Sequence, residues 1–100
     1  LIQATNGKSN GITPWLKTAH LAETFNMQVC PHYLMELHVG LCAAVPNAAW
    51  VEFIPQLDAA TESKIKIVDG YAVPSDEVGI GIAWDWKAIE AMRVEFATIA

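Results

Sequence analysis

The sequence predicts an α/β fold in which helices alternate with parallel strands, followed by a tail of a different kind. Along residues 11–55, apolar positions at helical spacing alternate with short apolar runs that contain proline. Short connections between such elements require parallel strands joined by right-handed crossovers. Beyond residue 58 the residues alternate around an Asp-Gly pair, which is typical of a β-hairpin. We therefore divide the chain into residues 1–58 and residues 59–100.

Helix signals fill residues 11–26, written GITPWLKTAHLAETFN, and residues 1–4 are interpreted as the end of an earlier strand. Thr13 suits the N-cap of this helix and Pro14 its first position. Apolar residues at helical spacing predict its buried face: Trp15, Ala19, Ala22 and Phe25.

A buried strand, a second helix and a second strand are predicted next. The run MQVCPH, residues 27–32, is a short strand whose C-terminal end carries His32. A helix follows over residues 34–45 and ends at Pro46, and the strand AWVEFIP, residues 49–55, carries Glu52. The predicted buried face of the helix consists of Leu34, Leu37, Leu41 and Ala44.

The tail is predicted to contain a hairpin and a short helix. Residues 64–75, KIKIVDGYAVPS, alternate around Asp69-Gly70, a pair that favours a two-residue turn. Residues 85–92, DWKAIEAM, have the pattern of a short helix. We expect this tail to be distinct from the preceding α/β segment.

Composition limits the class of protein. The chain has 100 residues, 53% of them hydrophobic, which suits one small domain or a segment of a larger one. Its net charge of −5 and scattered basic residues argue against nucleic acid as a partner. Its apolar runs are shorter than the roughly 20 residues of a membrane helix. Cys30 and Cys42 form no C-x-x-C pair and suit reduced thiols, so we expect a cytoplasmic protein.

His32 and Glu52 are the candidate catalytic residues. A strand buried on both faces offers no water to Glu52, so its charge must be paired, bind a ligand or be neutralised. If the strands close into a barrel, their C-terminal ends meet at one mouth and bring the two residues together. A histidine can then move a proton, and a buried carboxyl group can donate a hydrogen bond to developing negative charge. On spacing alone, the simpler interpretation is a strand-end histidine beside a salt-bridged glutamate.

Four motifs resemble the mandelate racemase group of the enolase superfamily, the mandelate racemase/muconate lactonizing enzyme family. They are G-[IV]-T-x-W before the first helix, P-H at a strand end, E-x-H-x-x-L in the next helix, and W-[VL]-E. The resemblance covers about residues 8–90, and DGYAVPSDEVGIGIAWDW is similar to that group's C-terminal tail. It implies an α/β fold holding about strands 6 to 8 of a (β/α)7β TIM-like barrel, with a tail that joins an N-terminal capping domain.

The resemblance implies a chemistry for both candidate residues. His32 falls on the position of the general base, and Glu52 on that of the acid that hydrogen-bonds the enolate oxygen. The implied reaction removes the proton alpha to a carboxylate, with Mg²⁺ holding the enolate. The run PHYLMELH favours an acid-sugar (aldonate or aldarate) dehydratase, and a racemase or epimerase of a 2-hydroxy acid is the alternative. The expected partner is a small sugar acid or 2-hydroxy acid, and the parent is expected to be a homo-oligomer.

Two departures bear on this expectation. Thr5 stands where the family places the aspartate that holds the histidine tautomer, so it marks a degenerate dyad position. The metal-binding carboxylates of the family belong to strands 2 to 5, so we expect no metal ligand here and the Mg²⁺ ligands upstream. We therefore expect a segment of an enzyme that is inactive alone. A truncated, non-catalytic fragment is the other hypothesis.

Two further histidines and one tryptophan could have either a functional or a structural role. His20 is interpreted as a surface or structural residue of the first helix. His38 follows Glu36 by two positions, which is not the i, i+4 spacing of two metal ligands on one helical face, so local pairing or packing is expected. Trp50 is the candidate for an aromatic substrate platform.

Overall fold

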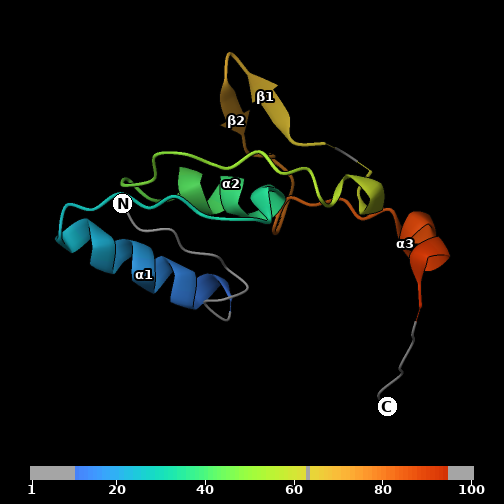
Figure 1. The fold of residues 1–100 in the computed structure, drawn as a ribbon, viewed down its shortest axis with the longest axis horizontal. Helices are drawn as coiled ribbons and strands as arrows, with labels where there is room; N and C mark the ends of the chain where they lie inside the picture. The colour runs from blue at the N-terminus through green and yellow to red at the C-terminus, as the bar shows by residue number, and fades with distance from the viewer. Residues whose placement is uncertain (1–10, 63, 95–100) are drawn as a thin grey trace.

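The computed structural model describes residues 11–62 and 64–94 of the chain (Figure 1). Its elements are α1 (Ile12–Thr24), α2 (Met35–Ala43), the 3-10 turn η1 (Asp58–Ala60), β1 (Lys66–Val68), β2 (Tyr71–Val73) and α3 (Trp86–Met92). The expected end of an earlier strand and Thr5 lie outside the described residues. No helix in the described ranges has the length and apolar content needed to cross a membrane.

Helix α1 begins at a glycine rather than at the predicted threonine cap. The amide of Trp15 donates to the carbonyl oxygen of Gly11 at 3.2 Å, which makes Gly11 the N-cap. Gly11 has φ +120°, a conformation that favours glycine. Thr13 and Pro14 lie in the first turn, where backbone amides have no helical acceptor and the missing N–H of proline costs nothing. The prediction of Thr13 as N-cap is therefore wrong.

One core cluster lies between α1 and the segments that follow it. It contains Trp15, Ala19 and Ala22 of α1, as predicted, together with Val29 and Val45. Leu41 and Cys42 of α2 pack against this cluster, so the two helices share it. The predicted fourth position of the α1 face is wrong. Phe25 is the C-cap and is exposed, because Asn26 adopts φ +54° and the chain turns away there.

Helix α2 buries a different face from the one predicted. Its buried residues are Met35, His38 and Val39. Leu34, expected in the buried face, is instead the N-cap in a left-handed conformation, with φ +46°. The segment LMELHVGLCAAV is apolar at most positions, so residue spacing does not fix which side faces the core.

The two predicted parallel strands meet at a single bridge. Val29 pairs with Ala48 in parallel orientation, with hydrogen bonds from the amide of Val29 to Asn47 at 2.9 Å and from Ala49 to Val29 at 3.2 Å. The parallel relation is therefore confirmed at this position. Regular strands over residues 27–32 and 49–55 are not formed in the described chain, and that part of the prediction is wrong.

A physical reason for the short pairing lies in the sequence and in the neighbours. Pro31 and Pro55 have no N–H to donate to a ladder. Each segment also has one strand neighbour among the described residues, so its second edge makes no ladder bonds there. Asn47 supports the bridge through its side-chain Nδ2, which donates to the carbonyl oxygens of Ala19 and Met27, each at 3.0 Å.

The hairpin and the short helix of the tail form where the sequence predicts them. Strands β1 and β2 are antiparallel, and Val68 pairs with Tyr71 across the turn. Asp69 and Gly70 both have positive φ, as the favoured two-residue turn requires. Helix α3 is capped by Asp85, whose Oδ1 accepts from the amide of Ala88 at 3.0 Å. The domain boundary near residue 58 stays a prediction.

Candidate active site

The parallel bridge carries the two candidate residues to the same end of the paired segments. His32 lies three residues after Val29, and Glu52 lies four residues after Ala48. The segments run in the same direction, so both side chains follow the bridge on one side. His32 Nδ1 lies 2.6 Å from Glu52 Oε2. The structure thus brings together two residues that are twenty positions apart in the sequence.

A backbone amide completes the contact between them. The N–H of Tyr33 donates to the same oxygen, Oε2 of Glu52, at 3.2 Å. An ionised carboxylate oxygen can only accept hydrogen bonds. Because Oε2 lies at hydrogen-bond distance from Nδ1, we assign the ring hydrogen of His32 to Nδ1. The lone pair of the His32 ring is then on Nε2. Nε2 is then the ring nitrogen that can accept a proton.

The pair is half exposed, so the expected burial of Glu52 is wrong. The side chain of His32 is 41% accessible to solvent and that of Glu52 is 39%. The segment carrying Glu52 has a strand neighbour on one side among the described residues, so water reaches the carboxylate. A pair this exposed is expected to contribute about 0–1 kcal/mol to stability. The short distance between His32 Nδ1 and Glu52 Oε2 is therefore not the sign of a strongly stabilising ion pair.

Glu52 borders an apolar hollow of about 880 Å³. Its wall includes Met35 and Val39 of α2, Trp50 beside Glu52, and Ile67 and Tyr71 of the hairpin. Trp50 is 76% exposed. The residue that the sequence suggests as an aromatic platform therefore lies on the same wall as the candidate acid, with its ring available to solvent.

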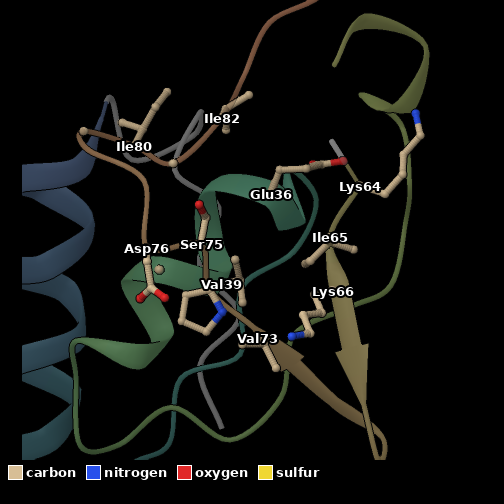
Figure 2. A pocket seen from close by; sticks show the side chains of 14 residues that line it. Glu36, Val39, Lys64, Ile65, Lys66, Val73, Ser75, Asp76, Ile80 and Ile82 are labelled. Carbon is tan, nitrogen blue, oxygen red and sulfur yellow. The ribbon is translucent and has the colours of Figure 1, made fainter. Parts of the chain in front are cut away.

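A second hollow, of about 370 Å³, is lined by residues other than His32 and Glu52 (Figure 2). It lies between α2, which contributes Glu36, and the segments that carry Lys64, Lys66 and Asp76. Both carboxylate oxygens of Glu36 are buried and have no hydrogen-bond partner in the described structure. A desolvated charge without a partner is destabilising. Sequence analysis did not single out this position as a site, because E-x-H spacing alone carries no sign of burial.

His38 is fully buried at the start of α2, which confirms its interpretation as a packing residue. Its Nδ1 lies 2.6 Å from the carbonyl oxygen of Tyr33, which can only accept, so Nδ1 carries the hydrogen. The ring centroid is 6.0 Å from that of Trp15. Burial lowers the pKa of His38 below 6.5, and hydrogen bonds to backbone carbonyl groups partly oppose that shift. The contact with Tyr33 was not foreseen, because it joins a helix to the turn before it.

The lowered pKa of His38 predicts acid destabilisation. Between the folded pKa and the unfolded value of 6.5, the unfolded chain binds more protons than the folded chain. This contribution to stability is complete above about pH 6.5 and is lost as the pH falls toward the folded pKa. We expect urea titrations to give a lower free energy of unfolding at about pH 5 than at about pH 7.5.

The variant His38→Asn, which cannot titrate, is the control for this measurement. It is expected to show a smaller loss of stability over the same pH range. Equal pH dependence in the two proteins would exclude His38 as the cause.

The described residues do not fit a magnesium site by themselves. No group of three His, Cys, Asp or Glu side chains within residues 11–62 and 64–94 is placed to hold a metal ion. His32 and Glu52 are two donors, and they contact each other. Cys42 lies partly against the core, where burial and then the nearby Cys30 raise the pKa of its thiol to about 11. It is therefore a poor ligand at neutral pH.

Comparison with known proteins identifies the family. Residues 1–88 match the family described as Enolase C-terminal domain-like. The chain belongs to this family. It is 32% identical over 87 residues to L-talarate/galactarate dehydratase of Salmonella typhimurium. The aligned residues make up 87% of this chain and 22% of that enzyme.

Solved structures of the enolase superfamily resemble the chain in three dimensions. A mandelate racemase/muconate lactonizing enzyme from Polaromonas sp. JS666 has 36% identity and a TM-score of 0.79, covering 86% of this chain and 24% of its own. L-Talarate dehydratase from the same organism, complexed with Mg and L-glucarate, has 35% identity and a TM-score of 0.74. The match covers 88% of this chain and 25% of that structure's chain. L-Talarate/galactarate dehydratase from Salmonella typhimurium LT2, liganded with Mg and L-lyxarohydroxamate, has 31% identity and a TM-score of 0.81, covering 88% and 22%.

These comparisons confirm the resemblance to the mandelate racemase/muconate lactonizing enzyme group. The chain is a small α/β segment similar to part of the C-terminal barrel-like domain of that superfamily. It spans a quarter or less of the length of the relatives reported above. Its assignment to about strands 6 to 8 of the barrel stays a prediction.

Proposed function

We propose that the parent of this chain is a Mg²⁺-dependent carbon-acid enzyme that dehydrates a sugar acid. The observation that carries the proposal is the contact of 2.6 Å between His32 Nδ1 and Glu52 Oε2 at the end of a parallel bridge. Relatives that act as L-talarate/galactarate dehydratase support the substrate class. The substrate class is a polyhydroxylated carboxylic acid with a hydroxyl group beta to the carboxylate.

His32 is the proposed base and then the proposed acid. Its Nε2 takes the proton alpha to the carboxylate, and the electrons of the C–H bond move into an enolate. The protonated ring then gives that proton to the beta-hydroxyl group as the C–O bond breaks and water leaves. The enol that remains becomes a 2-keto-3-deoxy acid. One histidine can serve both steps because an imidazole ring can accept a proton and later release it.

Glu52 is the proposed partner of the enolate oxygen. Its Oε2 already accepts from Tyr33 and contacts His32, so Oε1 is the oxygen that would carry a proton toward the substrate. A carboxylic acid donates such a bond when water is excluded from it. The half-exposed pair therefore requires that substrate and the remainder of the parent cover it. The magnesium ligands are proposed to lie in the upstream part of the parent.

Two alternatives are also supported by observations. A racemase or epimerase of a 2-hydroxy acid would use the same pair and return the proton to carbon, and a 36% identical structure is described as a mandelate racemase/muconate lactonizing enzyme. A non-catalytic fragment is favoured by Thr5 at the dyad position and by the exposure of the pair, 41% for His32 and 39% for Glu52.

One experiment separates the three. The parent protein is incubated with a panel of sugar acids and Mg²⁺ in D₂O, and ¹H NMR follows the substrate and products. A dehydratase is expected to form a 2-keto-3-deoxy acid. Loss of the alpha-proton signal without formation of a 2-keto-3-deoxy acid would indicate a racemase or epimerase. Complete retention of that signal with every acid would contradict the proposal of a carbon-acid enzyme.

A further inference from the structure

We propose that His38 is a positioning residue that holds His32 and Glu52 together through the peptide of Tyr33. The proposal adds a third residue to the candidate site, and its kinetic consequences rest on the proposed function. It is carried by three contacts that share atoms or residues. They run from a buried ring in α2 to the half-exposed pair.

The turn between His32 and α2 is strained and needs support. Tyr33 has φ +70° and Leu34 has φ +46°, so two consecutive residues with side chains adopt the left-handed conformation. Residues with a side chain rarely adopt this conformation, because Cβ then lies too close to the following carbonyl oxygen. This turn also directs the N–H of Tyr33 at Glu52. The surroundings must therefore fix a conformation that the isolated peptide would avoid.

His38 supplies such a contact. Its Nδ1–H donates to the carbonyl oxygen of Tyr33 at 2.6 Å, and its own amide donates to Leu34 at 3.0 Å. The first bond holds the strained residue directly. The second ties the start of α2 to the next residue of the turn. Both residues with positive φ are thus bonded to His38.

The same turn also contacts the candidate pair, through the backbone amide of Tyr33. The N–H of Tyr33 donates to Glu52 Oε2 at 3.2 Å, and that oxygen lies 2.6 Å from His32 Nδ1. A shift of the Tyr33 peptide would therefore move the carboxylate that fixes the ring of His32. Loss of this constraint would allow both tautomers of the neutral His32 ring. The tautomer that carries its hydrogen on Nε2 has no lone pair there and cannot accept a proton at that atom.

Burial makes His38 a stiff support. Its side chain is fully inaccessible to solvent and lies against the ring of Trp15, which belongs to the core of α1. Burial also lowers its pKa, so the ring is neutral at pH 7 and donates from Nδ1. The half-exposed contact between His32 and Glu52 is in this way connected to the buried core cluster that contains Trp15.

Matched substitutions of His38 test the proposal. His38→Asn keeps a donor at the position of Nδ1, whereas His38→Leu fills the volume without a donor. In uniformly ¹⁵N-labelled chain, the imidazole ¹⁵N shifts of His32 report which ring nitrogen carries hydrogen. We expect the Nδ1–H form in the original chain and in H38N, and a mixture of both forms in H38L. H20N and H20L, at an exposed position of α1, are the controls and should keep the original spectrum.

The parent enzyme provides a second measurement. H38L is expected to lower kcat about ten- to hundredfold with little change in KM, because the substituted residue does not touch the substrate. H38N is expected to recover most of the loss. Absence of any turnover in the unmodified parent would refute the proposed function, and the NMR measurement would still decide the role of His38.

Two results would overturn the proposal. One is a folded H38L chain in which His32 keeps the Nδ1–H form. The other is an H38N chain that loses this form as fully as H38L, which would assign the effect to packing volume instead of the hydrogen bond. If H38L does not fold, His38→Met, which has a flexible apolar side chain, replaces it with the same expected outcome.

Discussion

If the proposed function is correct, replacing His32 by asparagine in the parent protein is expected to lower kcat by about 10²–10⁴-fold, the usual contribution of a general acid–base residue. Asparagine places an amide group near the position of Nδ1, so it can still donate to Glu52 Oε2. It has no atom at the position of Nε2 that can take a proton from carbon. The substitution therefore removes proton transfer while it preserves the contact with Glu52.

The measurement is the rate of dehydration together with exchange of the alpha proton in D₂O. Both rates should fall together, because both begin with the same C–H bond. His20→Asn is the matched control, since His20 is an exposed residue of α1, and it should leave both rates unchanged. If H32N retained proton exchange, the base would have to be another residue of the parent.

Replacing Trp15 by alanine is expected to destabilise the 100-residue chain by about 3–5 kcal/mol. Trp15 has no accessible surface and lies in the core cluster with Ala19, Val29 and Val45. Alanine removes the indole ring and leaves a cavity that small neighbours cannot fill. Since a domain of this size is stable by only about 5–15 kcal/mol, the variant should be close to unfolding.

Urea titration measures this loss as a change in the free energy of unfolding. Trp86→Ala is the control, because Trp86 is 71% exposed at the start of α3 and its loss should change stability by about 0.5 kcal/mol or less. Equal effects of the two substitutions would show that the cluster around Trp15 does not support the fold.

Local patterns predicted several elements correctly for physical reasons that act over a few residues. Three of the four predicted positions on the α1 face are buried, because helical spacing fixes which side chains share a face. The Asp69-Gly70 turn forms because both residues tolerate positive φ. The parallel orientation of the two segments was predicted from the order of elements alone, and the structure places their bridge at Val29 and Ala48.

Other predictions were wrong where local patterns left the answer open. The helix α2 is apolar on most sides, so the choice of Met35, His38 and Val39 as its buried face depends on where Leu34 ends the preceding turn. Glu52 was expected to be buried because its neighbours are apolar. Its actual exposure depends on how many strands lie beside it, which the pattern of one segment does not contain.

The chain's residue order was sufficient to name the family, to predict the first helix and the hairpin, and to mark His32 and Glu52 as candidates, because these conclusions follow from motifs and residue spacing. Only the folded chain decided which atoms of that pair meet, Nδ1 with Oε2, and that Tyr33 shares the contact. It also revealed the bond from His38 to Tyr33. These contacts depend on a left-handed turn and on a bridge between segments about twenty residues apart, and neither has a periodic signal in sequence.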